Sequence, residues 1–212
     1  MNEDGEKRPP LTFRRFAGLD RSGPPPPETL PDAPLRPWTI PNAIGVLRLI
    51  LIPVFVAVAW SAGGASLLAA GIYAVVAWGD YIDGIAARVT GQYSRLGAML
   101  DPAIDRLLVI SGVVVCWRFD LAAIPLLAAL VAREVVMLVG GVYALRRGAR
   151  IEINWWGRWG VWPAMGGLFL GICGARLAAS VMLAIGLLLL VIATLQYFRT
   201  ARAQLSQRTA ST

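Results

Sequence analysis

Residues 66–117 read SLLAAGIYAVVAWGDYIDGIAARVTGQYSRLGAMLDPAIDRLLVISGVVVCW, in which a short polar link joins two long apolar runs. Each run has about the 20 residues that an α-helix needs to cross a bilayer. Four aspartates flank the link, at Asp80, Asp83, Asp101 and Asp105. The stretch therefore predicts two membrane-spanning helices that carry acids near the ends joined by the link.

The rest of the chain repeats this apolar pattern. Hydrophobic residues make up 57% of the 212 residues and charged residues 16%, against about 25% charged in soluble domains. Candidate spans cover 40–60, 66–88, 96–117, 121–145, 159–175 and 177–198. The sequence thus predicts an all-α integral membrane protein with six transmembrane helices.

The cationic residues orient these spans. Arginines concentrate before the first span, in the links after the second and fourth spans, and after the last span. The positive-inside rule places these segments, and therefore both termini, in the cytoplasm of a multi-pass plasma-membrane protein. Because the net charge of +7 follows the links, it indicates topology and no nucleic-acid partner.

Three regions follow from the composition. Residues 1–36 are rich in proline and charge, which favours a disordered cytoplasmic tail. Residues 37–200 form the six-helix transmembrane domain, and residues 201–212 form a short cytoplasmic C-terminal tail.

Histidine is absent, which excludes Ser-His-Asp catalysis and histidine-bound metals. The two cysteines lie in apolar runs and indicate no disulfide framework or zinc site. Any bound metal must therefore be a hard cation with oxygen ligands.

The aspartates form two pairs. Asp80 and Asp83 are spaced i,i+3, and Asp101 and Asp105 are spaced i,i+4, so each pair shares a helix face. A charge at mid-membrane costs roughly 2.5–3.5 kcal/mol. Binding Mg²⁺ or Mn²⁺ offsets this cost: three carboxylates would hold one or two ions, and the fourth would act as a base.

The alternative is a buried network with arginines that only fixes helix packing. Its candidate cations are Arg88, Arg95 and Arg106.

Small residues surround the acids. Gly84, Ala87 and Gly97 leave little side-chain bulk, which favours close approach of a ligand. Ordinary small-residue helix packing is the alternative.

The pattern Asp80-xx-Asp83-Gly84-xx-Ala87-Arg88, eight residues, then Gly97-xxx-Asp101-xxx-Asp105 resembles the signature of the CDP-alcohol phosphotransferases, membrane enzymes of phospholipid synthesis. All eight positions and both spacings match, and the likeness covers about residues 38–200. It makes the chain similar to metal-dependent CDP-alcohol phosphatidyltransferases.

The resemblance implies roles for these positions. Asp80, Asp83, Asp101 and Asp105 surround two divalent ions, Mg²⁺ or Mn²⁺, which hold the diphosphate of CDP-diacylglycerol. The CDP-lipid pocket also includes Gly84, Ala87, Arg88 and Gly97. Asp105 is the expected general base, which deprotonates the acceptor hydroxyl so that CMP leaves. The family resemblance also implies a homodimer among membrane lipids.

The second half bears on the acceptor. Arg133 and Glu134 lie inside an apolar run, as a functional pair or a membrane-buried ion pair. Arg133, together with Arg147, Arg150 and Arg158, is a candidate for binding an acceptor phosphate. The alternative is that these arginines set the topology or attract lipid headgroups.

Residues 39–55 (TIPNAIGVLRLILIPVF) and 100–108 (LDPAIDRLL) resemble the phosphatidylglycerophosphate and cardiolipin synthase branch. Gly157-Arg158-Trp159-Gly160-Val161 keeps one cation of a segment typical of the former, and Gly160 is a small residue as in the latter. Two glycerol-type acceptors therefore stay open, glycerol-3-phosphate and phosphatidylglycerol.

Two other classes of protein remain as alternatives. A membrane transporter or channel with an acidic metal site would spread its acids over several spans. A non-catalytic scaffold would use the arginines to bind anionic lipid.

Overall fold

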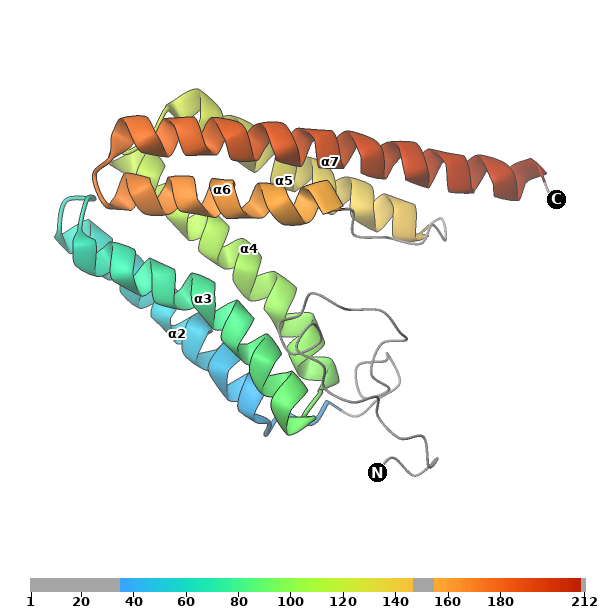
Figure 1. Ribbon diagram of the computed structural model, residues 1–212, viewed down its shortest axis with the longest axis horizontal. Coiled ribbons are helices and arrows are strands. Elements are labelled where there is room, and N and C mark those ends of the chain that lie inside the picture. The colour runs from blue at the N-terminus through green and yellow to red at the C-terminus, as the bar shows by residue number, and fades with distance from the viewer. Residues whose placement is uncertain (1–34, 147–154, 211–212) are drawn as a thin grey trace. The chain divides into compact units, whose positions relative to one another are not determined.

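The structure, a computed structural model, describes residues 35–146 and 155–210. Within these ranges it consists of helices joined by short links (Figure 1). The helices are α2 (Ile40–Ser61), α3 (Leu67–Thr90), α4 (Arg95–Arg118), α5 (Ile124–Arg146), α6 (Trp155–Ile172) and α7 (Arg176–Ala210). The all-α prediction is confirmed, and each helix overlaps one predicted span.

The largest difference from the predicted spans lies at the end of α7. This helix continues to Ala210, beyond the expected end at residue 198. The continuation is polar but contains no proline or glycine, and alanine, arginine, glutamine and leucine favour helix. The predicted span ended with the apolar run, whereas the residues that follow still favour a helix.

The chain packs as two units, whose boundary falls within α2, α3 and α4. The first unit comprises residues 35–51 and Val75–Arg106, and the second comprises Ile52–Ala74 and the described residues from Leu107 onward. All four aspartates of the sequence motif belong to the first unit.

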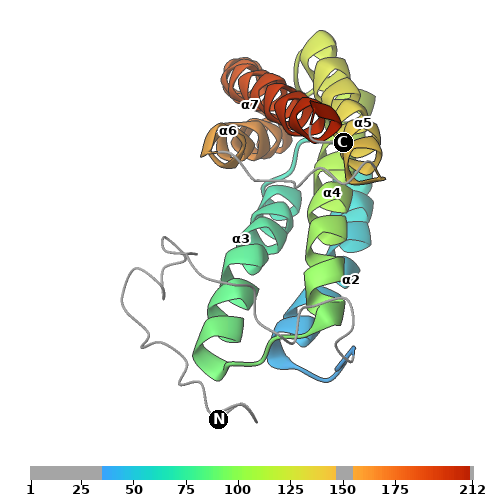
Figure 2. The ribbon, with the colours of Figure 1, turned by 90° about the vertical axis from the view of Figure 1, so that its right-hand side faces the viewer.

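In the first unit, one face of α2 packs against α3 and α4 (Figure 2). Its buried residues, Asn42, Gly45 and Arg48, recur every third position and so lie on one side of the helix. A Cβ on Gly45 would lie 3.6 Å from Cδ1 of Ile104. The interior of this unit therefore combines an apolar contact with the buried polar side chains of Asn42 and Arg48 on α2 and of Asp83 and Ser94.

The second unit has an apolar interior. Phe55 and Tyr73 meet edge to face with ring centroids 5.4 Å apart. The helices α6 and α7 lie against each other, and a Cβ on Gly186 would be 2.5 Å from the backbone nitrogen of Ala164. Glycine thus allows the two backbones to approach closely, as is common between membrane helices.

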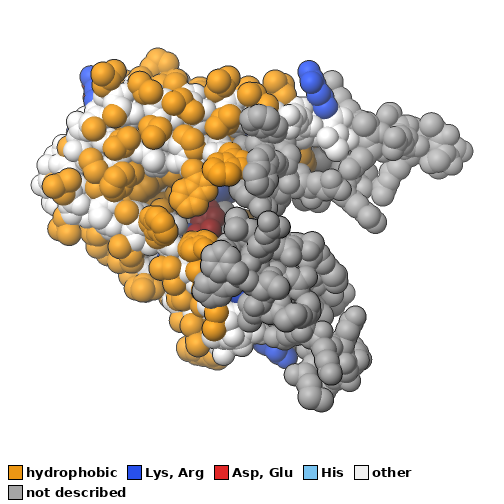
Figure 3. Space-filling model, in the orientation of Figure 1, with side chains coloured by type: hydrophobic (Ala, Val, Ile, Leu, Met, Phe, Trp, Pro, Cys, Tyr) orange, Lys and Arg blue, Asp and Glu red, His pale blue; other side chains and the backbone are white. Residues whose placement is uncertain are grey.

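Two described helical segments are long and apolar enough to span a membrane, Ile40–Ser61 and Arg176–Thr200, and Trp159–Ile172 is a shorter apolar helix. In each of the two spans, 28% of the most apolar window is buried, whereas the core helix of a soluble protein is mostly buried. Hydrophobic side chains cover much of the described surface in Figure 3. An all-helical chain with this exterior is consistent with a membrane protein.

Candidate active site

Two residues define the link between α3 and α4. Gly91 follows the last residue of α3 and has φ 65°, a left-handed conformation that favours glycine and commonly ends a helix. Ser94 precedes α4, and its Oγ accepts a hydrogen bond from the Gly97 N–H at 2.9 Å, as an N-cap does. The helix ends that carry the aspartates are therefore joined by a short turn.

The start of α2 braces this turn. The hydroxyl of Ser94 donates to Oδ1 of buried Asn42 at 2.8 Å, and the Asn42 amide donates to two carbonyls in the segment before α2. On the other side, Oε1 of Gln92 accepts the Ile40 N–H at 2.9 Å. These bonds fix the α3–α4 link against α2.

Arg48 of α2 lies among the motif carboxylates. Its Nη1 is 2.9 Å from Oδ2 of Asp83 and 3.6 Å from Oδ1 of Asp80, and its Nη2 is 2.6 Å from Oδ1 of Asp105. Its Nε donates to the carbonyl of Val76 at 3.0 Å. The side chain is 2% exposed, so one buried guanidinium connects α2 to acids on both α3 and α4.

Gly79 makes room for this guanidinium. A Cβ at Gly79 would lie 2.7 Å from Cδ and 2.8 Å from Cγ of Arg48, closer than real Cβ contacts. The glycine therefore admits the Arg48 side chain between α2 and α3.

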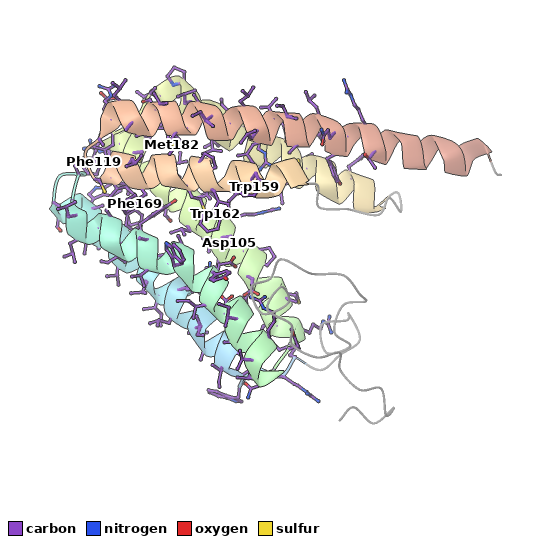
Figure 4. All side chains as sticks on the ribbon, viewed as in Figure 1. Asp105, Phe119, Trp159, Trp162, Phe169 and Met182 are labelled. Carbon is purple, nitrogen blue, oxygen red and sulfur yellow. The ribbon has the colours of Figure 1, made fainter. Side chains whose placement is uncertain are left out.

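The four carboxylates differ in exposure. Asp83 is buried, Asp80 and Asp105 are 51% and 45% exposed, and Asp101 is half-buried. Figure 4 labels Asp105 on α4. The site therefore has a buried side, where Arg48 lies, and an accessible side from which a substrate can approach.

The donor set fits a hard divalent cation in its chemistry. Asp83 and Asp105 each use one carboxylate oxygen to bind Arg48, and the second oxygen of each is the type of ligand that Mg²⁺ prefers. In the described part of the chain, however, no three acidic, cysteine or histidine side chains are grouped closely enough to hold one ion. Gathering them on an ion requires the side chains to shift.

The small residues of the motif divide by what lies next to them. A Cβ on Gly84 would be 3.3 Å from Nη1 of Arg88, whose guanidinium lies over the glycine one turn away. Gly97 faces α2, where a Cβ would be 2.7 Å from Oδ1 of Asn42. Ala87 is half-buried on α3. Close helix packing thus accounts for Gly97, while the CDP-lipid roles of all these residues stay predictions.

The acceptor candidates lie in the second unit. Nε of Arg133 on α5 donates to Oγ1 of Thr194 on α7 at 3.3 Å, and its Nη1 pairs with Glu134. The backbone of Arg158 lies in α6, but its side chain is outside the description, as are Arg147 and Arg150 entirely. An acceptor site at these residues stays a prediction.

Arg48 was not among the predicted partners of the acids, which were Arg88, Arg95 and Arg106. A signal was present in GVLRLILIP (45–53), where a single arginine interrupts an apolar run. A charge within a span is a functional candidate by default, and the same rule that selected Arg133 applies to Arg48.

Comparison with known proteins agrees with the motif. The model of the CDP-alcohol phosphatidyltransferase family matches residues 38–201, which include Arg48, the four aspartates and Arg133. The chain therefore belongs to the CDP-alcohol phosphatidyltransferase family, and the resemblance drawn from the sequence is confirmed.

Two different names occur among three of the relatives. A CDP-diacylglycerol--glycerol-3-phosphate 3-phosphatidyltransferase of Haemophilus influenzae is 28% identical over 79% of this chain and 96% of its own. Its namesake in Escherichia coli strain K12 is 33% identical over 57% of this chain and 69% of its own. A Mycobacterium tuberculosis protein named "Putative cardiolipin synthase" is 43% identical over 39% of this chain, and the match spans 43% of that relative.

Proposed function

We propose that this protein is a metal-dependent CDP-alcohol phosphatidyltransferase of glycerophospholipid synthesis. It transfers the phosphatidyl group of CDP-diacylglycerol to a glycerol-type alcohol and releases CMP. The observation that carries the proposal is the arrangement of the motif acids of α3 and α4 around Arg48, in a chain that belongs to this family.

The reaction needs a base and a site for a diphosphate. The acceptor oxygen attacks the phosphorus that bears the diacylglycerol, the bond from that phosphorus to the oxygen of CMP breaks, and the acceptor proton goes to a base. Asp105 is the proposed base because its carboxylate is 45% exposed and is oriented by Arg48. Asp80, which is also half-exposed, and Gly84, Ala87, Arg88 and Gly97 are the proposed CDP-lipid contacts.

Asp80, Asp83, Asp101 and Asp105 are the proposed ligands of two divalent ions, Mg²⁺ or Mn²⁺. Ions held there would supply neutralisation of the charge on a phosphate group under attack. The carboxylates contribute hard oxygen donors, and Arg48 contributes one fixed positive charge beside them.

The proposed setting is the plasma membrane, with six spans, both termini in the cytoplasm and the site facing the cytoplasm. The arginine-rich links support this orientation, and the apolar exterior supports the membrane. We further propose a homodimer. Cysteine accessibility in intact cells tests the topology: a cysteine introduced at Gln92 is expected to react only after the membrane is permeabilised, and one at Asp120 before it.

Both acceptors are kept in the proposal because the relatives carry both names. Glycerol-3-phosphate would yield phosphatidylglycerophosphate, and phosphatidylglycerol would yield cardiolipin. Arg133, Arg147, Arg150 and Arg158 are the proposed acceptor-binding residues. Glycerol-3-phosphate carries a phosphate dianion, whereas the phosphate of phosphatidylglycerol is a diester with one negative charge. The negative charge that these arginines would bind therefore depends on which acceptor is used.

The test is CMP release by the purified full-length protein in lipid nanodiscs with CDP-diacylglycerol and Mg²⁺ or Mn²⁺. Glycerol-3-phosphate, phosphatidylglycerol, inositol-1-phosphate and serine are offered side by side. We expect one of the first two acceptors to support turnover. If no acceptor supports CMP release and the protein in liposomes shows metal-dependent ion flux, the protein would instead be a transporter or channel.

Asp105→Asn removes the proposed base while keeping the shape of the side chain. Turnover is expected to fall by about 10²–10⁴-fold, the usual contribution of a positioned base, while CDP-diacylglycerol still binds. Asp120→Asn is the matched control because Asp120 lies outside the motif at φ 52°, which asparagine also tolerates. Near-normal turnover of the Asp105 variant would exclude Asp105 as the base.

A further inference from the structure

We infer that Arg48 is a positioning residue of this site: it acts as a built-in cation that occupies one oxygen of Asp83 and one of Asp105, and it thereby orients the remaining oxygens and weakens the binding of divalent ions. The inference rests on the proposed function. It assigns a role to a residue on α2, outside the aspartate motif of α3 and α4.

The contacts of Arg48 use the planar shape of its guanidinium. Separate nitrogens reach Asp83 on α3 at 2.9 Å and Asp105 on α4 at 2.6 Å. The third nitrogen, Nε, donates to the carbonyl of Val76 at 3.0 Å. Three directed hydrogen bonds on one rigid group fix the relative positions of the two carboxylates, which a single ammonium group does not do in the same way.

The surroundings indicate that this position is built into the packing. Arg48 is 2% exposed, and Gly79 of α3 is packed so closely against its aliphatic stem that a Cβ would lie 2.7 Å from Cδ. A buried arginine at a helix interface requires partners for its charge, and two motif carboxylates supply hydrogen bonds to it. These carboxylates therefore balance the charge of the Arg48 guanidinium even when no metal is bound.

The charge balance sets the expected effect on ions. The single charge of Arg48 can balance only one of the four motif carboxylates, so the acids that it contacts retain negative charge that attracts a divalent cation. The positive charge of Arg48 also repels that cation and holds two of the carboxylate oxygens. Removing it should strengthen ion binding and at the same time loosen the geometry that turnover requires.

The experiment measures these two effects separately on the full-length protein in nanodiscs. Mn²⁺ binding is followed without nucleotide by the electron paramagnetic resonance signal of the free ion, and turnover by CMP release. For Arg48→Met we expect Mn²⁺ to bind about tenfold more tightly, because a nearby like charge is gone. We expect kcat to fall by about 10–100-fold, the usual effect of removing a residue that orients metal ligands.

Arg48→Lys separates charge from shape. The variant keeps the positive charge, so Mn²⁺ affinity should stay within about threefold of wild type. It loses the planar fork, so kcat should still fall by about tenfold or more.

Gly79→Ala tests the same inference without changing any charge. The new methyl group displaces the Arg48 side chain, so kcat should fall by about tenfold while Mn²⁺ binds more tightly. Gly71→Ala on the same helix is the matched control, since its Cβ would meet nothing within 4 Å. In an Arg48→Met background, Gly79→Ala should have no further effect on either measurement.

Two results would overturn the inference. One is an Arg48→Met protein that binds Mn²⁺ as weakly as wild type or more weakly, and the other is a Gly79→Ala protein that behaves like Gly71→Ala. If Arg48→Met does not fold, the comparison of Gly79→Ala with Gly71→Ala decides whether the inference holds. A wild-type protein that releases no CMP would contradict the proposed function. The Mn²⁺ measurement needs no substrate, so it would still test the effect of Arg48 on ion binding.

Discussion

Each of the two units contains a cluster of charged side chains, and the two clusters differ in balance. In the first unit, Arg48 contacts three acids that lie 32 to 57 positions further along the chain. In the second unit, Arg133 pairs with its sequence neighbour Glu134 and with the hydroxyl of Thr194. In these described contacts Arg48 meets three acids, whereas Arg133 meets one.

The difference leads to separate expectations for the two clusters. The charges of Arg133 and Glu134 balance each other, so this pair does not require a further ion. Under the proposed function, the remaining negative charge of the first cluster is balanced by the metal ions that accompany a phosphate substrate. Mutations should therefore affect chemistry in the first unit, and stability or acceptor affinity in the second.

The largest effect is expected for Asp83→Ala. It removes a proposed metal ligand and a partner of buried Arg48, so unfolding free energy should fall by about 3 kcal/mol, and CMP release by about 10²–10³-fold. Thermal unfolding in detergent and the CMP assay check these values. Comparable losses for Glu134→Ala would remove the contrast between the clusters.

Arg133→Gln tests whether the second cluster also serves the acceptor. Losing a charged hydrogen-bond donor to a phosphate costs about 1.5–3 kcal/mol, so the acceptor KM should rise by roughly 10–100-fold. The KM for CDP-diacylglycerol should stay unchanged. Thr194→Val is the control because it removes the hydroxyl partner of Arg133 and keeps the charge. A lower melting temperature with an unchanged acceptor KM would make the pair purely structural.

Gly186→Ala should affect packing without affecting chemistry. Its Cβ would lie 2.5 Å from the backbone nitrogen of Ala164, which cannot move aside as a flexible side chain can. Overpacking of this kind costs about 1–3 kcal/mol. Gly166→Ala, whose Cβ meets nothing within 4 Å, should be as stable as wild type. Equal melting curves for the two variants would contradict the close approach of α6 and α7.

Arg176→Gln should have the smallest effect. Arg176 binds Asp120 at 2.7 Å, but both side chains are more than half exposed. Exposed ion pairs contribute about 0–1 kcal/mol, so the melting temperature should shift little and the shift should shrink in high salt. A larger loss would mean that exposed pairs in this unit carry more of its stability than the buried contacts between α6 and α7.

Much of the helical content could be read from the chain because its cause is local. The apolar runs predicted the ends of the described helices to within several residues, except at the end of α7, where the helix continues beyond the apolar run. The link from Gly91 to Ser94 is also local, since a glycine after one helix and a serine before the next are ordinary end signals. The ligand role of Gly97 stays a prediction, and its close packing against Asn42 could not be predicted because it depends on a residue of another helix.

By itself the sequence determined the chemical class of the site, because two acid pairs at helical spacing, joined by a short link, bring four carboxylates to two joined helix ends. It also determined which chemistries are excluded, since no histidine is present. Only the tertiary structure decided which cation meets those acids. Helical spacing defines the residues that share a face of one helix, but the residue that faces them from another helix depends on packing, here on the room that Gly79 leaves for Arg48.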